Sequence, residues 1–335
     1  MTRSFADRPA RRESMPLMLG LWGPSGGGKT LSALRLAAGI RRVVGGDVFV
    51  IDTEGGRSLH YADAHEFRHV DFLPPFGPDD YCAAVEHCVT AGARTIVIDS
   101  CSHEHEGPGG VLEMHAAEVE RLSRGNAGKA DRVKMLAWVA PKQARRRLIN
   151  RLLQIRVNVI SCWRAKERLD VRPGREPTPM GWAPIGGDEW IYEQAASAFL
   201  PAGASGRPQW RSDMPAEVAA IKLPAHLAPL FGDGQITEDT GERLARWAAG
   251  DAAAVPASSE PSPPTPRSAD AGRPQAAPLA ARLLAAIADA RSLPELGAVA
   301  STVRDAKGRL SPSEIEQLAA AYTTRSAALR AEAGQ

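Results

Sequence analysis

GPSGGGKT, residues 23–30, stands between an apolar run, PLMLGLWG at 16–23, and a stretch with leucines at helical spacing. It satisfies the pattern GxxxxGK[ST] in the strand-to-helix context that the pattern requires. Three consecutive glycines let the backbone curl around an anion, and the helix that begins there adds about half a positive charge. We expect Lys29 to reach the β- and γ-phosphates of a nucleoside triphosphate and the Thr30 hydroxyl to bind Mg²⁺. The predicted phosphate site comprises Gly23, Pro24, Ser25, Gly26, Gly27, Gly28, Lys29 and Thr30.

Strands and helices are expected to alternate after this segment. Apolar runs predict strands at 16–23, 48–52, 69–73, 95–100 and 157–162, with shorter ones at 195–200 and 219–223. Helical spacing predicts helices at 29–44, 79–92, from about 110, at 141–155 and at 238–249. Polar or Gly- and Pro-rich composition predicts loops at 122–134 and 164–187. This alternation indicates an α/β fold with a parallel sheet that carries helices on both faces.

Two predicted strands end in an acid, in VFVIDTEGG (48–56) and in TIVIDS (95–100). Asp99 is expected to hold Mg²⁺ directly or through water, although an acid at a strand end can also cap the next turn. The next residue is Ser100, where many P-loop ATPases carry the glutamate that polarises the attacking water. A hydrolytic site therefore needs its acid elsewhere, and Glu54, just past the adjacent strand, is the leading candidate. Asp52 is expected to be structural.

GPSGGGKT, VFVIDTEGGR and TIVIDS together resemble the core of the RecA/RadA-type recombinases. More closely, residues 16–250 resemble phage-encoded, single-domain RecA-like ATPases of the AAA family. The resemblance implies ATP hydrolysis with Mg²⁺, with Lys29 and Glu54 as catalytic residues and Asp99 as the Walker B aspartate. It also implies a role in recombination, annealing or repair on single-stranded DNA, and sites completed between copies in a homo-oligomer.

One motif departs from the resemblance. RecA-type proteins carry a polar sensor, usually glutamine, at the end of the fifth core strand, where this chain has Ser161-Cys162-Trp163-Arg164. Arg164 or Lys166 is the candidate substitute. Tyr61 is expected to serve packing rather than adenine stacking.

Two basic segments are candidates for DNA binding. The predicted helix 141–155 opposes a basic face to Leu148, Ile149, Leu152 and Ile155, and the segment 164–187 adds cations flanked by Trp163 and Trp182. Basic groups with aromatic neighbours suit single-stranded nucleic acid. For the helix, a solvated face is the simpler interpretation, and a contact with the DNA backbone or with another subunit is the alternative. The candidate residues are Lys142, Arg146, Arg147, Arg151, Arg168, Arg172 and Arg175, and the acids Glu167, Asp170 and Glu176 dilute the signal.

The segment SHEHEG, residues 102–107, permits three interpretations. If it is extended, His103 and His105 lie on one side and could bind zinc, but no companion ligand motif follows. A solvated loop beside the nucleotide is the simpler interpretation. Glu104 is a reserve candidate for the acid that activates water.

The rest of the chain suggests smaller additions. Residues 1–15 are expected to be a disordered basic tail, 251–278 a linker rich in Pro, Ala and Ser, and 279–335 a small helical module that could dock on a protein partner. A formal net charge of +2 requires any affinity for nucleic acid to come from local patches. Four cysteines without CxxC spacing predict a reduced, cytoplasmic setting, and no apolar run is long enough to predict a membrane segment. The resemblance to phage-encoded ATPases implies a bacterial or phage-infected host cell.

Three functions are compatible with these features. The first is an ATPase, stimulated by DNA, that acts in phage or prophage recombination, annealing or repair. The second is a non-enzymatic, nucleotide-gated adaptor that recruits a replication or packaging partner. Glu54 favours the first, because an adaptor needs no hydrolytic acid. A nucleotide kinase is weaker, because the chain has no obvious arginine-rich lid.

Overall fold

The computed structural model describes residues 7, 15–251, 279–290, 292–305 and 312–333. The chain divides into two compact units, one within residues 1–260 and the other within 261–335. The predicted tail (1–15) and linker (251–278) lie almost wholly outside the described residues.

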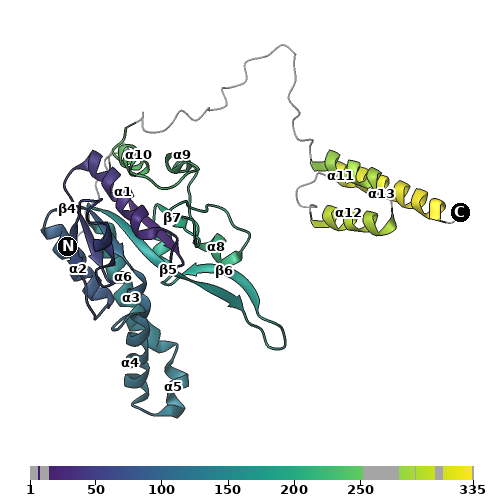
Figure 1. The fold of residues 1–335 in the computed structure, drawn as a ribbon. Coiled ribbons are helices and arrows are strands. Elements are labelled where there is room, and N and C mark those ends of the chain that lie inside the picture. Colours follow the sequence, from purple (N-terminus) through teal and green to yellow (C-terminus); the bar gives the residue numbers. More distant parts are fainter. Residues whose placement is uncertain (1–6, 8–14, 252–278, 291, 306–311, 334–335) are drawn as a thin grey trace. The chain divides into compact units, whose positions relative to one another are not determined.

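The first unit is built on a seven-stranded sheet in the order β3-β2-β4-β5-β1-β7, with β6 added beside β5 (Figure 1). All neighbouring strands are parallel except β5 and β6, which are antiparallel. The strands are β1 (Met18–Gly23), β2 (Asp47–Asp52), β3 (Arg68–Asp71), β4 (Ala93–Asp99), β5 (Asn158–Asp170), β6 (Thr178–Pro184) and β7 (Ala196–Phe199). Because β1, β2 and β4 point the same way, their carboxyl ends meet at one edge, where ligands of open α/β sheets bind.

Helices cover both faces of this sheet, as the alternation predicted. One core joins α1 (Lys29–Val44), α9 (Ala228–Phe231) and α10 (Glu238–Ala248) to β1 and β2. The opposite core joins α2 (Pro78–Thr90) and α6 (Val139–Gln154) to β2, β4 and β5. The four apolar residues expected on one face of α6 (Leu148, Ile149, Leu152 and Ile155) are all buried in this second core.

Helices α1 and α10 approach each other through glycine. A Cβ atom on Gly39 of α1 would meet the carbonyl oxygen of Glu238 at 1.8 Å, and one on Gly241 of α10 would meet that of Leu36 at 2.2 Å. No side chain fits at either point without moving a backbone.

Four local predictions were wrong. Residues 122–134 include a helix, α5 (Ala127–Val133), which follows α4 (Val111–Ser123). Residues 164–187 are mostly a β-hairpin, because β5 continues to Asp170 and pairs with β6. Instead of the strand expected at 219–223, residues 219 and 220 end α8 (Pro215–Ala220), and Lys222 makes only an isolated bridge with Ser197. The segment SHEHEG, for which a solvated loop was the simpler interpretation, forms a short helix, α3 (Ser102–Glu106), with Ser102 and Glu104 buried.

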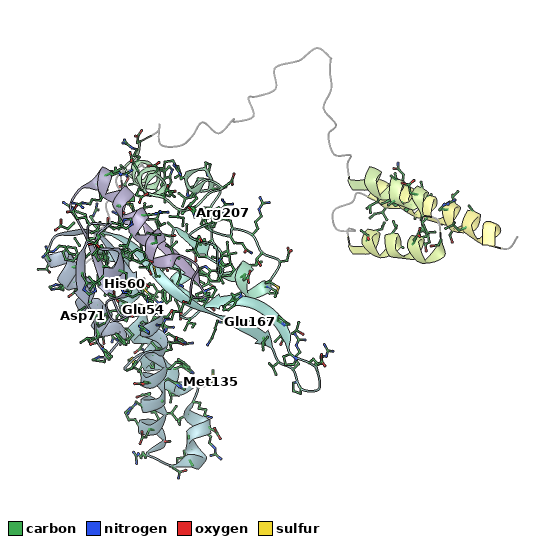
Figure 2. The ribbon with its side chains drawn as sticks, in the orientation of Figure 1. Glu54, His60, Asp71, Met135, Glu167 and Arg207 are labelled. Carbon is green, nitrogen blue, oxygen red and sulfur yellow. The ribbon has the colours of Figure 1, made fainter. Side chains whose placement is uncertain are left out.

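Two of these elements extend outward from the sheet (Figure 1). They are the α4–α5 pair and the β5–β6 hairpin. Figure 2 shows Glu167 on the hairpin and Glu54 in the body of the domain. The remaining short elements are the 3-10 turns η1 (Arg57–Tyr61) and η2 (Leu136–Trp138) and the helix α7 (Glu189–Glu193).

The second unit contains α11 (Leu279–Asp289), α12 (Leu293–Asp305) and α13 (Pro312–Ala333). Its core includes Leu283, Ile287, Leu296 and Leu318, and Val299 and Tyr322 pack against it. The backbone N–H of Glu295 donates to the Ser292 hydroxyl at 3.4 Å, which caps the start of α12.

Candidate functional site

The phosphate-binding loop connects β1 to α1. Gly26 and Gly28 adopt φ of 80° and 89°, a left-handed conformation that other residues rarely adopt. The Lys29 ammonium donates to the carbonyl oxygens of Gly23 at 2.9 Å and Pro24 at 2.8 Å, so it lies folded against the loop. Burial lowers the pKa of Lys29, and the nearby carboxylates of Asp99 and Glu54 counteract part of this effect.

Asp99 ends β4 directly beside the start of α1. The Thr30 hydroxyl donates to its Oδ2 at 2.5 Å. Burial raises the pKa of Asp99 to about 6, while the Thr30 hydrogen bond acts in the opposite direction. A hydroxyl and a carboxylate are the hard oxygen ligands that Mg²⁺ prefers, so this pair fits the metal that accompanies a nucleotide.

Asp52 ends β2 and organises the turn that follows. Its Oδ1 accepts the backbone N–H of Glu54 at 2.7 Å, and its Oδ2 accepts the backbone N–H of Ser58 at 2.9 Å and the Ser58 hydroxyl at 2.5 Å. Burial raises the pKa of Asp52, but these hydrogen bonds outweigh it and hold the pKa below its ordinary value. One buried carboxylate therefore fixes both ends of the segment 54–58, in agreement with the expected structural role.

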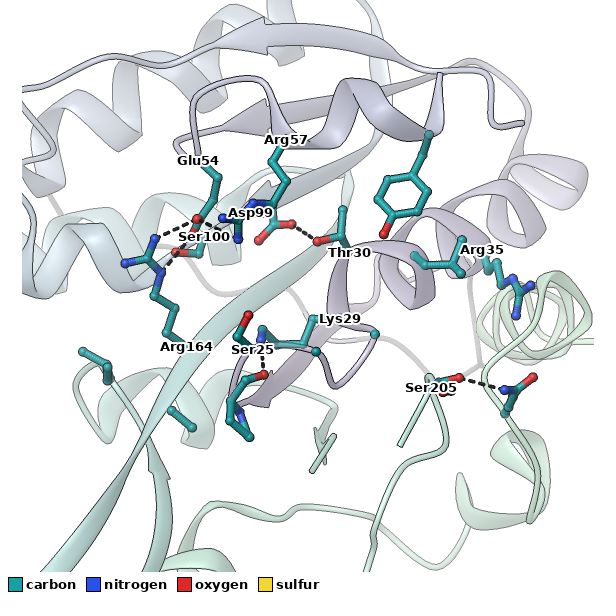
Figure 3. A pocket seen from close by; sticks show the side chains of 18 of the residues that line it. Ser25, Lys29, Thr30, Arg35, Glu54, Arg57, Asp99, Ser100, Arg164 and Ser205 are labelled. Atoms are coloured by element: carbon teal, nitrogen blue, oxygen red, sulfur yellow. Dashed lines mark hydrogen bonds and ion pairs between the residues drawn. The ribbon is translucent and has the colours of Figure 1, made fainter. Parts of the chain in front are cut away.

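Glu54 extends from this turn toward the phosphate loop (Figure 3). Its side chain is only 8% exposed. The Arg164 guanidinium donates to both carboxylate oxygens, from Nε at 2.9 Å and from Nη2 at 2.7 Å. A second guanidinium, that of Arg57, lies 3.5 Å from Oε2. Burial raises the pKa of Glu54, but the Arg164 hydrogen bonds and charge lower it more, so the group is ionised at neutral pH.

These groups line a cavity of about 900 Å³, a volume typical of small-molecule sites. Figure 3 shows Glu54, Arg57 and Arg164 toward one end and Arg35 and Ser205 toward the other, with Lys29 and Thr30 between them. At the Arg35 end, the segment that contains Ser205 and Gly206 contacts the phosphate-binding loop, because the Gly206 N–H donates to the Gly27 carbonyl at 3.0 Å. The Gln235 amide donates to the Ser205 carbonyl at 2.8 Å.

Sequence reasoning missed several cavity residues. Arg57 follows the recognised DTEGG motif, but it carried no motif signal of its own. Ser205 and Gln235 come from loops without a pattern. Tyr61, expected in packing, both contacts the core and lines the cavity. The missed residues with polar side chains are Arg35, Arg57, Glu106, Ser205 and Gln235, and Leu31, Ala165 and Ile185 also line the cavity.

Of the two sensor candidates, the structure brings Arg164 to the cavity, and Lys166 is exposed on the hairpin. The backbone N–H of Arg164 donates to the Ser102 hydroxyl at 2.8 Å, which fixes the start of the hairpin strand against α3.

Glu104, the reserve candidate for the catalytic acid, lies outside the cavity. Its side chain is fully buried and accepts two hydrogen bonds from Arg145 Nε, at 3.0 and 3.2 Å, and one from Nη2, at 2.8 Å. Burial raises the pKa of Glu104, and the contacts with Arg145 oppose that rise. The pair joins α3 to α6, and we infer a structural role.

The two histidines of the zinc hypothesis point to different partners. His103 Nδ1 lies 2.7 Å from the Thr53 hydroxyl, and His105 Nδ1 lies 2.9 Å from Arg145 Nη2. Within the part of the chain that the structure describes, no three His, Cys, Asp or Glu side chains cluster in a way that could hold a metal ion.

The candidate DNA-binding residues separate into two groups. Arg147 and Arg151 pair with Asp79 and Glu86 of α2, both at 2.9 Å, and Arg172 pairs with Asp170 at 2.8 Å. The structure gives no ion pair within the described residues for the second group, which consists of Lys142 and Arg146 on α6 and Arg168 and Arg175 in the hairpin segment. These four residues are exposed, as are Arg147 and Arg172 of the first group.

The sheet order, the phosphate loop and the Thr30–Asp99 pair define a P-loop domain that binds nucleoside triphosphates. A family model described as an AAA domain matches residues 15–191, which is more than half of the 335 residues. The chain therefore belongs to this AAA domain family, whose members are nucleotide-binding ATPases. No curated protein matches the sequence. Among the described helices, none is long and apolar enough to cross a membrane.

Proposed function

We propose that this chain is a Mg²⁺-dependent ATPase that works as a RecA-like motor or switch on DNA, in phage or prophage recombination, single-strand annealing or repair. The observation that carries the proposal is Glu54: an ionised, nearly buried carboxylate in the nucleotide cavity, one strand away from Asp99. A protein that only binds nucleotide needs no such acid.

Each group has a defined task in hydrolysis. The loop N–H groups and Lys29 bind the phosphates, which requires the Lys29 ammonium to exchange its loop carbonyls for phosphate oxygens. Thr30 and Asp99 would hold Mg²⁺, which supplies charge neutralisation on the β- and γ-phosphates when bound. Tyr61 and Gln235 also line the cavity.

Glu54 orients the water that attacks. The water oxygen bonds to the γ-phosphorus, the bond to the β–γ bridging oxygen breaks, ADP leaves with that electron pair, and the water proton passes to phosphate or solvent. Because its pKa is lowered, Glu54 acts by accepting a hydrogen bond and polarising the water rather than by storing the proton. At least one Arg164 hydrogen bond must open for water to reach a Glu54 oxygen.

Single-stranded DNA is the proposed effector. Arg164 begins the part of β5 that forms the hairpin, and Arg168 and Arg175 are exposed further along it. A nucleic acid bound along the hairpin would thus act on the same strand segment that carries the Glu54 partner. Arg146 and Lys142 on α6 remain candidate phosphate contacts. We further propose that the protein is a cytoplasmic homo-oligomer, and that the unit within 279–335 binds a protein partner.

One observation favours the adaptor as a second candidate. Both carboxylate oxygens of Glu54 are occupied by Arg164, an arrangement compatible with a protein that binds ATP and does not hydrolyse it.

ATP turnover of the parent and of Glu54→Gln, with and without single-stranded DNA, separates the two candidates. We expect the substitution to abolish turnover and preserve ATP binding, because the amide keeps the shape of the carboxylate and loses its charge. Glu66→Gln is the matched control: Glu66 also pairs with an arginine, Arg41, at 2.7 Å, but lies outside the cavity.

Normal turnover in Glu54→Gln would remove Glu54 from its role. A parent that binds ATP without turnover, unchanged by DNA, would favour the adaptor.

A further inference from the structure

Arg57 is a cation in the cavity that the proposed hydrolysis has not used. It lies at the start of η1, three residues after Glu54, and its guanidinium Nη1 is 3.5 Å from Glu54 Oε2. The side chain is 61% exposed, yet it lines the nucleotide cavity at the Glu54 end (Figure 3). The position that polarises water therefore has an arginine beside it from the same turn.

The backbone conformation of residues 54–58 fixes the position from which the Arg57 side chain extends. Gly55 and Gly56 adopt φ of 68° and 81°, and this left-handed pair reverses the chain between Glu54 and Arg57. Asp52 then fixes the N–H groups of Glu54 and Ser58, on either side of the reversal. The turn is anchored at both ends, while the long Arg57 side chain keeps its rotational freedom.

The other cavity cations already have tasks or lie elsewhere. Lys29 belongs to the phosphate loop. Arg164 makes two short hydrogen bonds to Glu54 and is fixed through its backbone N–H to Ser102. Arg35 lies toward the opposite end of the cavity (Figure 3). Among the described residues Arg57 makes one ion pair, at 3.5 Å, so it is the cation at this end of the cavity that can move to a new anion at the lowest cost.

We propose that Arg57 is a catalytic arginine supplied in cis, which contacts the γ-phosphate oxygens and neutralises charge that develops on them during hydrolysis. The proposal rests on the proposed ATPase function of this site. An arginine in this role is worth about 10³–10⁵ in kcat in nucleotide hydrolases that use one. The resemblance to RecA-type proteins implied a group donated by a neighbouring copy, whereas an arginine in cis makes the chemical step independent of that neighbour.

The alternative is that Arg57 makes only a surface ion pair. Only the arginine of this pair is exposed and the pair is long, at 3.5 Å, so we expect it to contribute little to stability. Arg68 provides a control outside the cavity, because it is 57% exposed and lies 3.5 Å from Asp47. Its guanidinium also lies over the Phe49 ring, 4.8 Å from the centroid, so Arg68→Ala removes a packing contact as well as an ion pair. A loss of turnover in Arg57→Ala that is absent in Arg68→Ala therefore reports on chemistry.

The first measurement is steady-state ATP turnover of the full chain for the parent, Arg57→Ala, Arg57→Lys and Arg68→Ala. We expect Arg57→Ala to lose on the order of 10³-fold in kcat with KM changed only a few-fold, Arg57→Lys to recover part of kcat, and Arg68→Ala to match the parent. The specific activity of the parent should also stay constant as the protein concentration is raised.

The second measurement is binding of ADP with and without aluminium fluoride, which imitates the transferred phosphoryl group. Arg57→Ala should bind ADP like the parent and lose the additional affinity that aluminium fluoride confers. A merely structural role would weaken both.

The outcomes distinguish a failure of the proposed ATPase function from a failure of the proposed role of Arg57. A parent without turnover contradicts the ATPase function itself. A parent that turns over, with Arg57→Ala equal to it, contradicts the role of Arg57. Specific activity that rises steeply with protein concentration contradicts supply in cis.

Discussion

Asp52→Asn tests whether one buried carboxylate holds the catalytic turn. Asp52 accepts three hydrogen bonds, from the Glu54 N–H, the Ser58 N–H and the Ser58 hydroxyl. Asparagine has one acceptor oxygen, so its NH₂ group must face one of the two backbone N–H groups. One N–H is then left without a partner, which costs about 1–3 kcal/mol, and the remaining bonds lose the charge of the acceptor. We expect the free energy of unfolding to fall by about 2–4 kcal/mol.

The assay is urea unfolding followed by tryptophan fluorescence. All seven tryptophans lie before residue 248, so the signal follows the first unit alone. Asp71→Asn is the control, because Asp71 pairs in register with Asp52 on the neighbouring strand β3 and is exposed.

The same variant should separate binding from chemistry. Among the described residues, the Asp52 side chain forms its hydrogen bonds with the turn that carries Glu54 and Arg57 and none with the phosphate loop, so we expect nucleotide affinity to persist while kcat falls. If Asp52→Asn unfolds at the urea concentration of the parent, or hydrolyses ATP at its rate, the reasoning that Asp52 organises the turn is wrong.

Two further predictions concern stability. Gly39→Ala should destabilise the first unit by about 1–3 kcal/mol in thermal unfolding despite the better helix propensity of alanine, because its Cβ meets the Glu238 carbonyl. The control is Gly297→Ala in α12, where the Cβ has open space and where we expect a gain in stability of up to about 1 kcal/mol. Equal effects at the two sites would contradict this reasoning. His105 has a pKa lowered by burial and by the Arg145 charge from 6.5 to about 4, so its neutral form is favoured on folding and stability is lost as the pH falls from about 6.5 toward 4. At 1.36 kcal/mol per pKa unit the full effect is about 3 kcal/mol, and solvent screening reduces the expectation to about 1–2 kcal/mol. His105→Gln should lose less stability than the parent between pH 7 and pH 5 in urea unfolding, and parallel losses would refute the assignment.

The β5–β6 hairpin shows why part of the fold escaped prediction. The second half of β5, RAKERLD at 164–170, has almost no apolar residue to alternate, and β6 contains Pro179 and Gly181, which disfavour strands. These segments are strands because they pair with each other in antiparallel register. A pattern that depends on burial cannot detect a ribbon that extends from the domain.

The strand predicted at 219–223 was wrong because of a local signal that the apolar pattern does not include. The stretch AAIKL has the composition of a short strand, but Pro215 begins a helical turn that ends at Ala220. A proline at the first helical position decided the local structure, and the apolar residues after it only fill the core.

The phosphate loop could be predicted because its chemistry is local. Eight consecutive residues, the strand before them and the helix after them contain all the information needed for a backbone that binds an anion. The same holds for the strands that end in Asp52 and Asp99, whose apolar runs and final acids are visible in the chain itself.

The partners of those acids depend on the tertiary structure. Glu54 and Arg164 are 110 residues apart in the sequence and meet because β2, β4 and β5 are neighbours in the sheet. Glu104 and Arg145 are separated by 41 residues and are joined by the packing of α3 against α6. Charge pairing between distant segments leaves no period and no motif in the sequence, because it depends only on where the fold places two side chains. The residue types of the site can therefore be predicted from the local sequence, whereas the hydrogen bonds and the lowered pKa of Glu54 depend on the order of the strands in the sheet.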